Sequence, residues 1–133
     1  MNIEDTETTV DDVYAKYNEL YLFWLNMDQL EGLSQDLLET KIMEFKATES
    51  KVISEGFISP NEDFEELMPE NLKFLVMPVI LADFYTRKQG GRLEYLNKAE
   101  YQYHQFLKLM SHYQICPKHL EDIFEKIRAA PKY

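Results

Sequence analysis

Cysteine, long apolar runs and strand-like patterns are all scarce in this chain of 133 residues. Its single cysteine, Cys116, cannot form an internal disulfide, and the acidic, polar N-terminus lacks the positive start and apolar core of a signal peptide. We therefore expect a reducing, cytoplasmic environment. The longest apolar run, 74–82, contains a proline and is far shorter than the roughly 20 residues of a membrane-spanning helix, so no membrane association is expected.

Basic residues are in the minority. The 14 lysines and arginines stand against 24 acidic residues, and the formal charge of −10 repels phosphate backbones and anionic lipid heads. Nucleic acid is therefore not an expected partner. A hydrophobic content of 45% supports one core in a chain of this length, which is too short for two ordinary domains. We predict a monomer with a disordered N-terminus over 1–10 and a single helical domain over 11–133.

Apolar residues recur at helical spacing. Val13, Tyr17 and Leu20 begin a series of three- and four-residue steps, which predicts a first helix from near Asp11. No run alternates as a strand would, and no Asn-Gly hairpin turn occurs in the sequence. The predicted fold class is all-α, with about six antiparallel helices joined by short turns into a bundle.

Capping residues indicate where the next helices begin and end. Ser34 is placed as the N-cap of a second helix, which Gly56 ends because glycine tolerates left-handed geometry. Ser59 and Glu62 then have the spacing of a capping box, with a proline between them at the first helical position. This pattern predicts a short third helix over 60–67.

Proline and glycine divide the remainder of the chain. Pro69 opens a fourth helix, expected to reach Lys88, whose apolar residues cover most of its circumference. We predict that it is the central buried element and that Pro78 bends it. The glycine pair 90–91 precedes a fifth helix, and Pro117 begins a sixth.

No sequence pattern points to catalysis or metal binding. The spacing of His112, Cys116 and His119 resembles half a zinc site, but a structural site needs four ligands and no second pair completes it. The sequence has no nucleophile elbow, no phosphate-binding glycine loop and no HExxH motif. We expect no cofactor and no metal, and an enzyme is less favoured than either of the two non-catalytic interpretations given below.

Aromatic and basic residues gather around the fifth helix. The tyrosines on or beside it are Tyr95, Tyr101, Tyr103 and Tyr113. Tyrosine suits both a core edge and an interface, and we favour the core for these four. The basic residues Arg87, Lys88 and Arg92 surround the glycine pair. They form either a solvated face or a local positive patch that orients a partner.

Four segments of distinctive sequence follow one another in the second half of the chain. They are NEDFEEL at 61–67, NLKFLVMP at 71–78, GRLEYL at 91–96 and FLKLMSHY at 106–113. In this order they resemble the alpha-4 family, also called two-A-phosphatase-associated proteins. The resemblance implies a tetratricopeptide-like helical domain without catalytic activity. It also implies binding to the catalytic subunits of type 2A phosphatases and of the related type 4 and type 6 enzymes, which the family shields outside complete holoenzymes.

The contact residues of the family are only partly present in this sequence. The resemblance implies a basic Arg-x-x-Lys pair in a later lysine-rich helix, helped by an acidic residue on the second helix. Arg128 and Lys132 have the wrong spacing for that pair, with a proline between them, so either the protein continues beyond the given sequence or it is a shortened relative. Asp36 and Glu39 on the second helix join the three basic residues above as candidate partner-binding residues.

Two main interpretations of the function stay open. The first is a phosphatase regulatory and chaperone-like subunit. The second is a helical-repeat adaptor that holds a peptide or another helix in its groove. The Arg-x-x-Lys pair, if it occurs downstream, favours the first.

Overall fold

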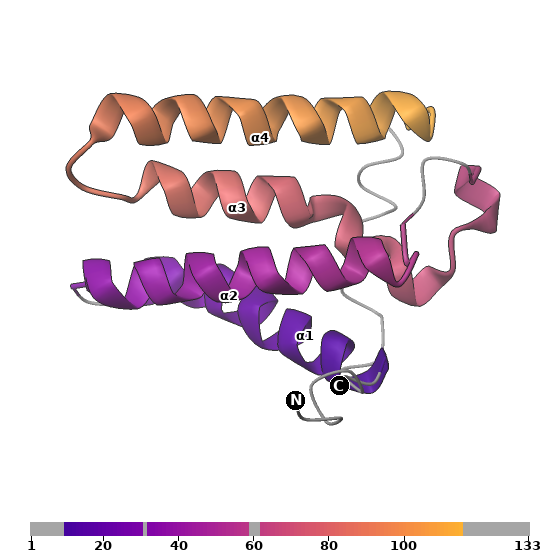
Figure 1. Ribbon diagram of the computed structural model, residues 1–133, viewed down its shortest axis with the longest axis horizontal. Coiled ribbons are helices and arrows are strands. Elements are labelled where there is room, and N and C mark those ends of the chain that lie inside the picture. The colour runs from indigo at the N-terminus through magenta and orange to yellow at the C-terminus, as the bar shows by residue number, and fades with distance from the viewer. Residues whose placement is uncertain (1–9, 31, 59–61, 116–133) are drawn as a thin grey trace, which may run out of the picture.

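Two stacked helical hairpins make up the described part of the molecule (Figure 1). The computed structural model describes residues 10–30, 32–58 and 62–115. These residues form α-helices and short 3₁₀ helices and no strand, which confirms the predicted all-α fold class. The α-helices are α1 (Val10–Asn26), α2 (Gln35–Ser54), α3 (Met77–Thr86) and α4 (Arg92–His112), and the 3₁₀ helices are η2 (Met27–Gln29), η3 (Phe64–Glu66) and η4 (Pro69–Val76).

The two hairpins pack against each other through α2 and α3. In Figure 1 the turn between α1 and α2 and the turn between α3 and α4 lie at the same end of the molecule. The predicted N-terminal segment falls almost wholly outside the described residues, and the predicted sixth helix, from Pro117, lies outside them too. The described residues therefore show four α-helices where about six helices were expected for the whole chain, and the tetratricopeptide-like arrangement stays a prediction.

Local capping signals place the ends of α2 correctly. The backbone N–H of Leu37 donates to Ser34 Oγ at 3.2 Å, as expected of an N-cap serine. Gly56 follows the helix with φ 74°, a left-handed conformation that costs a glycine little. Both predictions are confirmed.

The segment before α3 differs from the predicted short helix over 60–67. Its described part is non-helical at Glu62 and Asp63 and forms only the 3₁₀ turn η3. The backbone N–H of Asp63 donates to Glu66 Oε1 at 3.0 Å, so capping takes place one turn later than predicted. Glu62 instead contacts the end of α4, where its carbonyl lies 3.0 Å from His112 Nε2 and its carboxylate accepts from the Tyr113 hydroxyl at 3.3 Å.

The predicted fourth helix is two helices of different type. Residues 69–76 form the 3₁₀ helix η4, and the α-helical geometry begins only at Met77. The N–H of Met77 donates to the carbonyl of Phe74, the group that an N–H at position 78 would contact in a continuous α-helix. Pro78 has no N–H and lies in the first turn of α3, where proline is tolerated. The predicted bend inside one α-helix is thus replaced by a change of helix type.

One hydrophobic core extends through both hairpins. The ring of Phe74 stacks on Phe57 at 5.6 Å between centroids and meets the edge of Tyr17 at 4.7 Å. The Tyr17 hydroxyl donates to the carbonyl of Lys73, which satisfies a buried polar group in this core. Other fully buried side chains are Leu20, Leu38, Phe45, Leu75, Ile80, Leu81 and Phe84. The burial along η4 and α3 confirms that this segment is the central buried element.

A hydrogen bond on the edge of the core joins α1 to α3. Trp24 Nε1 donates to Asp83 Oδ2 at 2.7 Å, so the indole keeps its polar group satisfied while its ring packs against the core. None of the helices in the described part of the chain is long and apolar enough to cross a lipid bilayer.

Helix α4 is buried on one side only. Ala99 and Met110 are buried toward α3, whereas Leu93 and Leu107 are mostly exposed. Of the four tyrosines predicted to lie in the core, Tyr113 is buried and Tyr95 partly buried, but Tyr101 and Tyr103 are exposed. The prediction is wrong for these two because, among the described helices, α4 packs chiefly on α3 and lies at the outside of the stack (Figure 1).

Candidate partner-binding surface

The candidate residues from the sequence meet at the end of the molecule that carries both turns (Figure 1). We call this end the turn-end surface. It consists of Asp28, Asp36 and Glu39 from η2 and α2, of Arg87 and Lys88 from the connection after α3, and of Arg92, the first residue of α4. Acidic groups of the first hairpin therefore face basic groups of the second.

Lys88 and Glu39 form the innermost ion pair of the turn-end surface. Lys88 Nζ lies 2.8 Å from Glu39 Oε2, and the lysine side chain is largely buried. The hydrogen bond to Glu39 raises the pKa of Lys88 above its ordinary value, although burial opposes the shift, and Tyr95 and Asp36 add to the rise. The same ammonium lies 5.4 Å from the centroid of the Tyr95 ring.

Arg87 connects the two hairpins by its side chain and by its backbone. Its Nη2 lies 2.6 Å from Asp28 Oδ1, a residue 59 positions away in the sequence. The Gln35 amide donates to the carbonyl of Arg87 at 3.2 Å and accepts from the N–H of Gln89 at 2.9 Å. Sequence reasoning missed Asp28 and Gln35, because no local pattern indicates a partner from a distant turn.

Arg92 closes the connection between α3 and α4. Its guanidinium donates to the carbonyl of Thr86 and, at 3.1 Å, to the carbonyl of Lys88. Thr86 is the last residue of α3 and Lys88 follows two residues later, so the guanidinium lies at the C-terminal end of this helix, where a cation is favourable. The three predicted basic residues are thus each engaged within the fold, and any partner meets them together with their acidic or carbonyl contacts.

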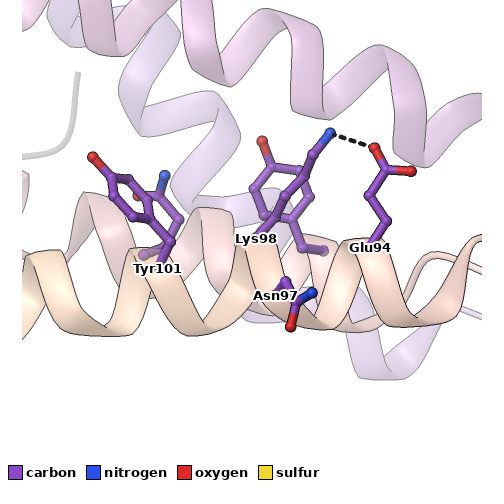
Figure 2. A pocket seen from close by; sticks show the side chains of 6 residues that line it. Glu94, Asn97, Lys98 and Tyr101 are labelled. Carbon is purple, nitrogen blue, oxygen red and sulfur yellow. Dashed lines mark ion pairs between the residues drawn. The ribbon is translucent and has the colours of Figure 1, made fainter.

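A groove of about 380 Å³ lies beside the turn-end surface, along one side of α4. We call it the aromatic groove; it is lined by Tyr85, Glu94, Asn97, Lys98, Tyr101 and Gln102. Figure 2 shows Glu94, Lys98 and Tyr101 projecting from the same side of α4, with an ion pair of 3.4 Å between Lys98 and Glu94. The spacing of these three residues places them on one helix face.

Stacked aromatic rings link the groove to the turn-end surface. Tyr85 and Tyr95 lie 6.0 Å apart between ring centroids in a stacked arrangement. Lys98 Nζ lies 5.2 Å from the Tyr95 centroid and 5.8 Å from that of Tyr85, so it contacts both rings. Because Lys88 contacts Tyr95 as well, the two surfaces form one continuous area.

The histidine pattern noted in the sequence is divided by the boundary of the described residues. His112 lies in α4, whereas Cys116 and His119 lie outside. Within residues 10–30, 32–58 and 62–115 no three histidine, cysteine, aspartate or glutamate side chains are grouped so that they could hold a metal ion.

These features define an α-helical hairpin protein whose charged end and groove are built from segments distant in the sequence. The TAP42-like family matches residues 10–133. The chain therefore belongs to this family, the alpha-4/Tap42 family of phosphatase-associated regulatory proteins, which is non-catalytic. This match confirms the resemblance carried by the four sequence segments. Neither the curated proteins nor the solved structures give a match to the chain.

The segments that carry the resemblance are mainly structural. NLKFLVMP supplies the buried residues Phe74 and Leu75, and FLKLMSHY supplies the buried Met110 and Tyr113. GRLEYL supplies Arg92, which closes the connection between α3 and α4. The segments that resemble the family therefore contribute mainly to the core and, through Arg92, to a smaller extent to the turn-end surface.

Proposed function

We propose that this protein is a non-catalytic, chaperone-like regulatory subunit that binds the catalytic subunits of type 2A protein phosphatases and of the related type 4 and type 6 enzymes. The observation that carries the proposal is the TAP42-like family match over residues 10–133, which covers nearly the whole chain. We further propose that it acts in the cytoplasm as a monomer.

We propose the turn-end surface as the contact region for the phosphatase. Asp36 is exposed there, and the Glu39 carboxylate remains nearly half exposed despite its pairing with Lys88. Arg87 and Arg92 hold the surface in place through their contacts to Asp28 and to the end of α3. A prearranged set of charges of both signs favours oriented association with a polar partner surface.

Calorimetry with purified type 2A, type 4 and type 6 catalytic subunits tests the proposal. We expect binding to at least one of them, and we expect Asp36→Lys to weaken it at least about tenfold, or about 1.4 kcal/mol. Glu55→Lys is the matched control, because Glu55 is also exposed but lies at the opposite end of α2. A folded protein that binds none of the three subunits contradicts the proposed function, and equal effects of both variants contradict the proposed surface.

The adaptor function remains the second candidate, and the aromatic groove is the observation that favours it. Its volume falls in the range of roughly 300–1,000 Å³ that is typical of binding pockets. An adaptor binds a peptide or helix in such a groove without a phosphatase. Peptide binding in the groove by a folded protein that binds none of the three phosphatase subunits supports this function.

A further inference from the structure

The floor of the aromatic groove suits an apolar side chain. Tyr85 of α3 is buried, and its ring is held in position by stacking on Tyr95 of α4. Tyr101 is 60% exposed and offers a free edge of the groove. A tyrosine ring with an open neighbouring volume can receive an apolar or aromatic side chain at little cost in entropy to the protein.

The charges around the groove are presented unequally to solvent. In each ion pair of this area the acid is the more exposed member. The side-chain exposures are 46% for Glu39 against 11% for Lys88, 68% for Glu94 against 45% for Lys98, and 80% for Asp28 against 33% for Arg87. A molecule that approaches this area therefore meets carboxylates first, even though the sequence places three basic residues here.

The lysines are poorly placed to receive an anion. Lys88 and Lys98 each have a carboxylate within ion-pair distance and an aromatic ring beneath the ammonium. An incoming carboxylate or phosphate has to displace Glu39 or Glu94 from these contacts. A carboxylate, by contrast, has about four acceptor positions, so each acid keeps room for a further donor.

We propose that the aromatic groove docks a basic segment of a partner protein, with one apolar side chain placed between Tyr85 and Tyr101 and flanking lysines or arginines placed on Glu39 and Glu94. The formal charge of −10 attracts such a segment from a distance. This inference goes beyond the proposed function, since it depends on the side chains of the groove and not on the identity of the partner.

Short fluorescent peptides test the proposal with the intact protein. The probe carries one leucine flanked on each side by two lysines, and two comparison peptides replace the leucine by alanine or the lysines by glutamates. We expect anisotropy to show the lysine–leucine peptide binding at least about tenfold more tightly than either comparison peptide, with affinity falling as salt increases. Equal binding of the glutamate peptide, or no binding of the lysine–leucine peptide, overturns the proposal.

Two variants localise the binding to the groove. We expect Glu94→Gln and Tyr101→Ala each to weaken the lysine–leucine peptide about threefold to tenfold. Both side chains are exposed, so the fold should be retained, and an unchanged melting temperature checks this. Glu55→Gln serves as the control and should bind like the unaltered protein. If neither groove variant weakens binding, the peptide site lies elsewhere and the proposal is wrong, whatever the outcome of the phosphatase calorimetry.

Discussion

Helix α4 lies beside the segment formed by η4 and α3. The apolar side chains of that segment are buried, whereas several of those on α4 are exposed. Leu75 and Ile80 are fully buried, whereas Leu93 and Leu107 are 74% and 60% exposed. The difference arises because η4 and α3 contact α1, α2 and α4, while α4 among the described helices meets mainly α3 and η4. Position in the stack, more than residue type, therefore decides what each of these aliphatic side chains contributes to stability.

The largest expected effect tests this contrast directly. Ile80→Ala should destabilise the protein by about 2–5 kcal/mol, because it removes a fully buried aliphatic side chain and leaves a cavity. Leu107→Ala should change the free energy of unfolding by less than about 0.5 kcal/mol, since the side chain is mostly exposed. Chemical denaturation of both variants checks the pair. Similar losses at the two positions would show that α4 is covered in solution.

A smaller effect is expected for Tyr17, whose hydroxyl donates to the buried η4 segment, in comparison with Tyr101 of α4. Tyr17→Phe leaves the buried carbonyl of Lys73 without its hydroxyl donor and should cost about 1–3 kcal/mol. Tyr101→Phe should cost less than about 0.5 kcal/mol because the ring is 60% exposed. Thermal unfolding at matched concentration distinguishes the two. If Tyr17→Phe loses no more stability than Tyr101→Phe, the hydrogen bond between Tyr17 and Lys73 does not stabilise the core.

The ion pair between the hairpins should contribute less again. Glu39→Gln removes the carboxylate partner of the largely buried Lys88 and should cost about 0.5–2 kcal/mol, whereas the exposed control Glu55→Gln should be near neutral. Because the folded pKa of Lys88 is raised, this contribution is present below the unfolded lysine pKa of about 10.4 and is lost as pH rises through the folded value.

Urea titrations from neutral to strongly alkaline pH measure this dependence. The difference between the unaltered protein and Glu39→Gln should hold from pH 7 to about 9 and should narrow above about 10.4. A difference that stays constant at high pH would mean that the glutamate acts through packing and not through the charge of Lys88.

The smallest expected effect has the opposite sign. Burial raises the pKa of Glu49 above its ordinary value, and Lys46 offsets this only in part. A raised carboxyl pKa stabilises the fold below the unfolded value of about 4.3, and this contribution is lost as pH rises through the folded value. Glu49→Gln should therefore be more stable than the unaltered protein at pH 7, by less than about 1 kcal/mol, and should show no gain near pH 3. A loss of stability at pH 7 would show that the carboxylate has a favourable contact.

Much of the fold was predictable because its signals are local. Ser34 and Gly56 mark the ends of α2 through hydrogen bonds and backbone geometry within a few residues of themselves. The apolar spacing of Val13, Tyr17 and Leu20 likewise predicts α1, and the side chains of all three residues are buried on the face that this spacing predicts.

The errors concern residues whose local signal competes with a distant contact. Glu62 has capping-box spacing, but its carbonyl and its carboxylate instead contact His112 and Tyr113 at the end of α4. Pro78 lies in an apolar run that reads as one long helix, yet the chain changes from 3₁₀ to α geometry just before it. Tyr101 and Tyr103 are aromatic residues of the kind that fill a core, but they are exposed because α4 lies at the outside of the stack.

The amino-acid sequence by itself determined the all-α class, the ends of α2, the central burial of Leu75 and Ile80, and membership of the TAP42-like family. Only the tertiary structure decided that Asp28 pairs with Arg87 and Glu39 with Lys88, and that Tyr85 and Tyr101 line one groove. The physical reason is range: caps and periodicity act within a few turns of one helix, whereas these contacts join residues of different helices, up to 59 positions apart, once two hairpins have stacked.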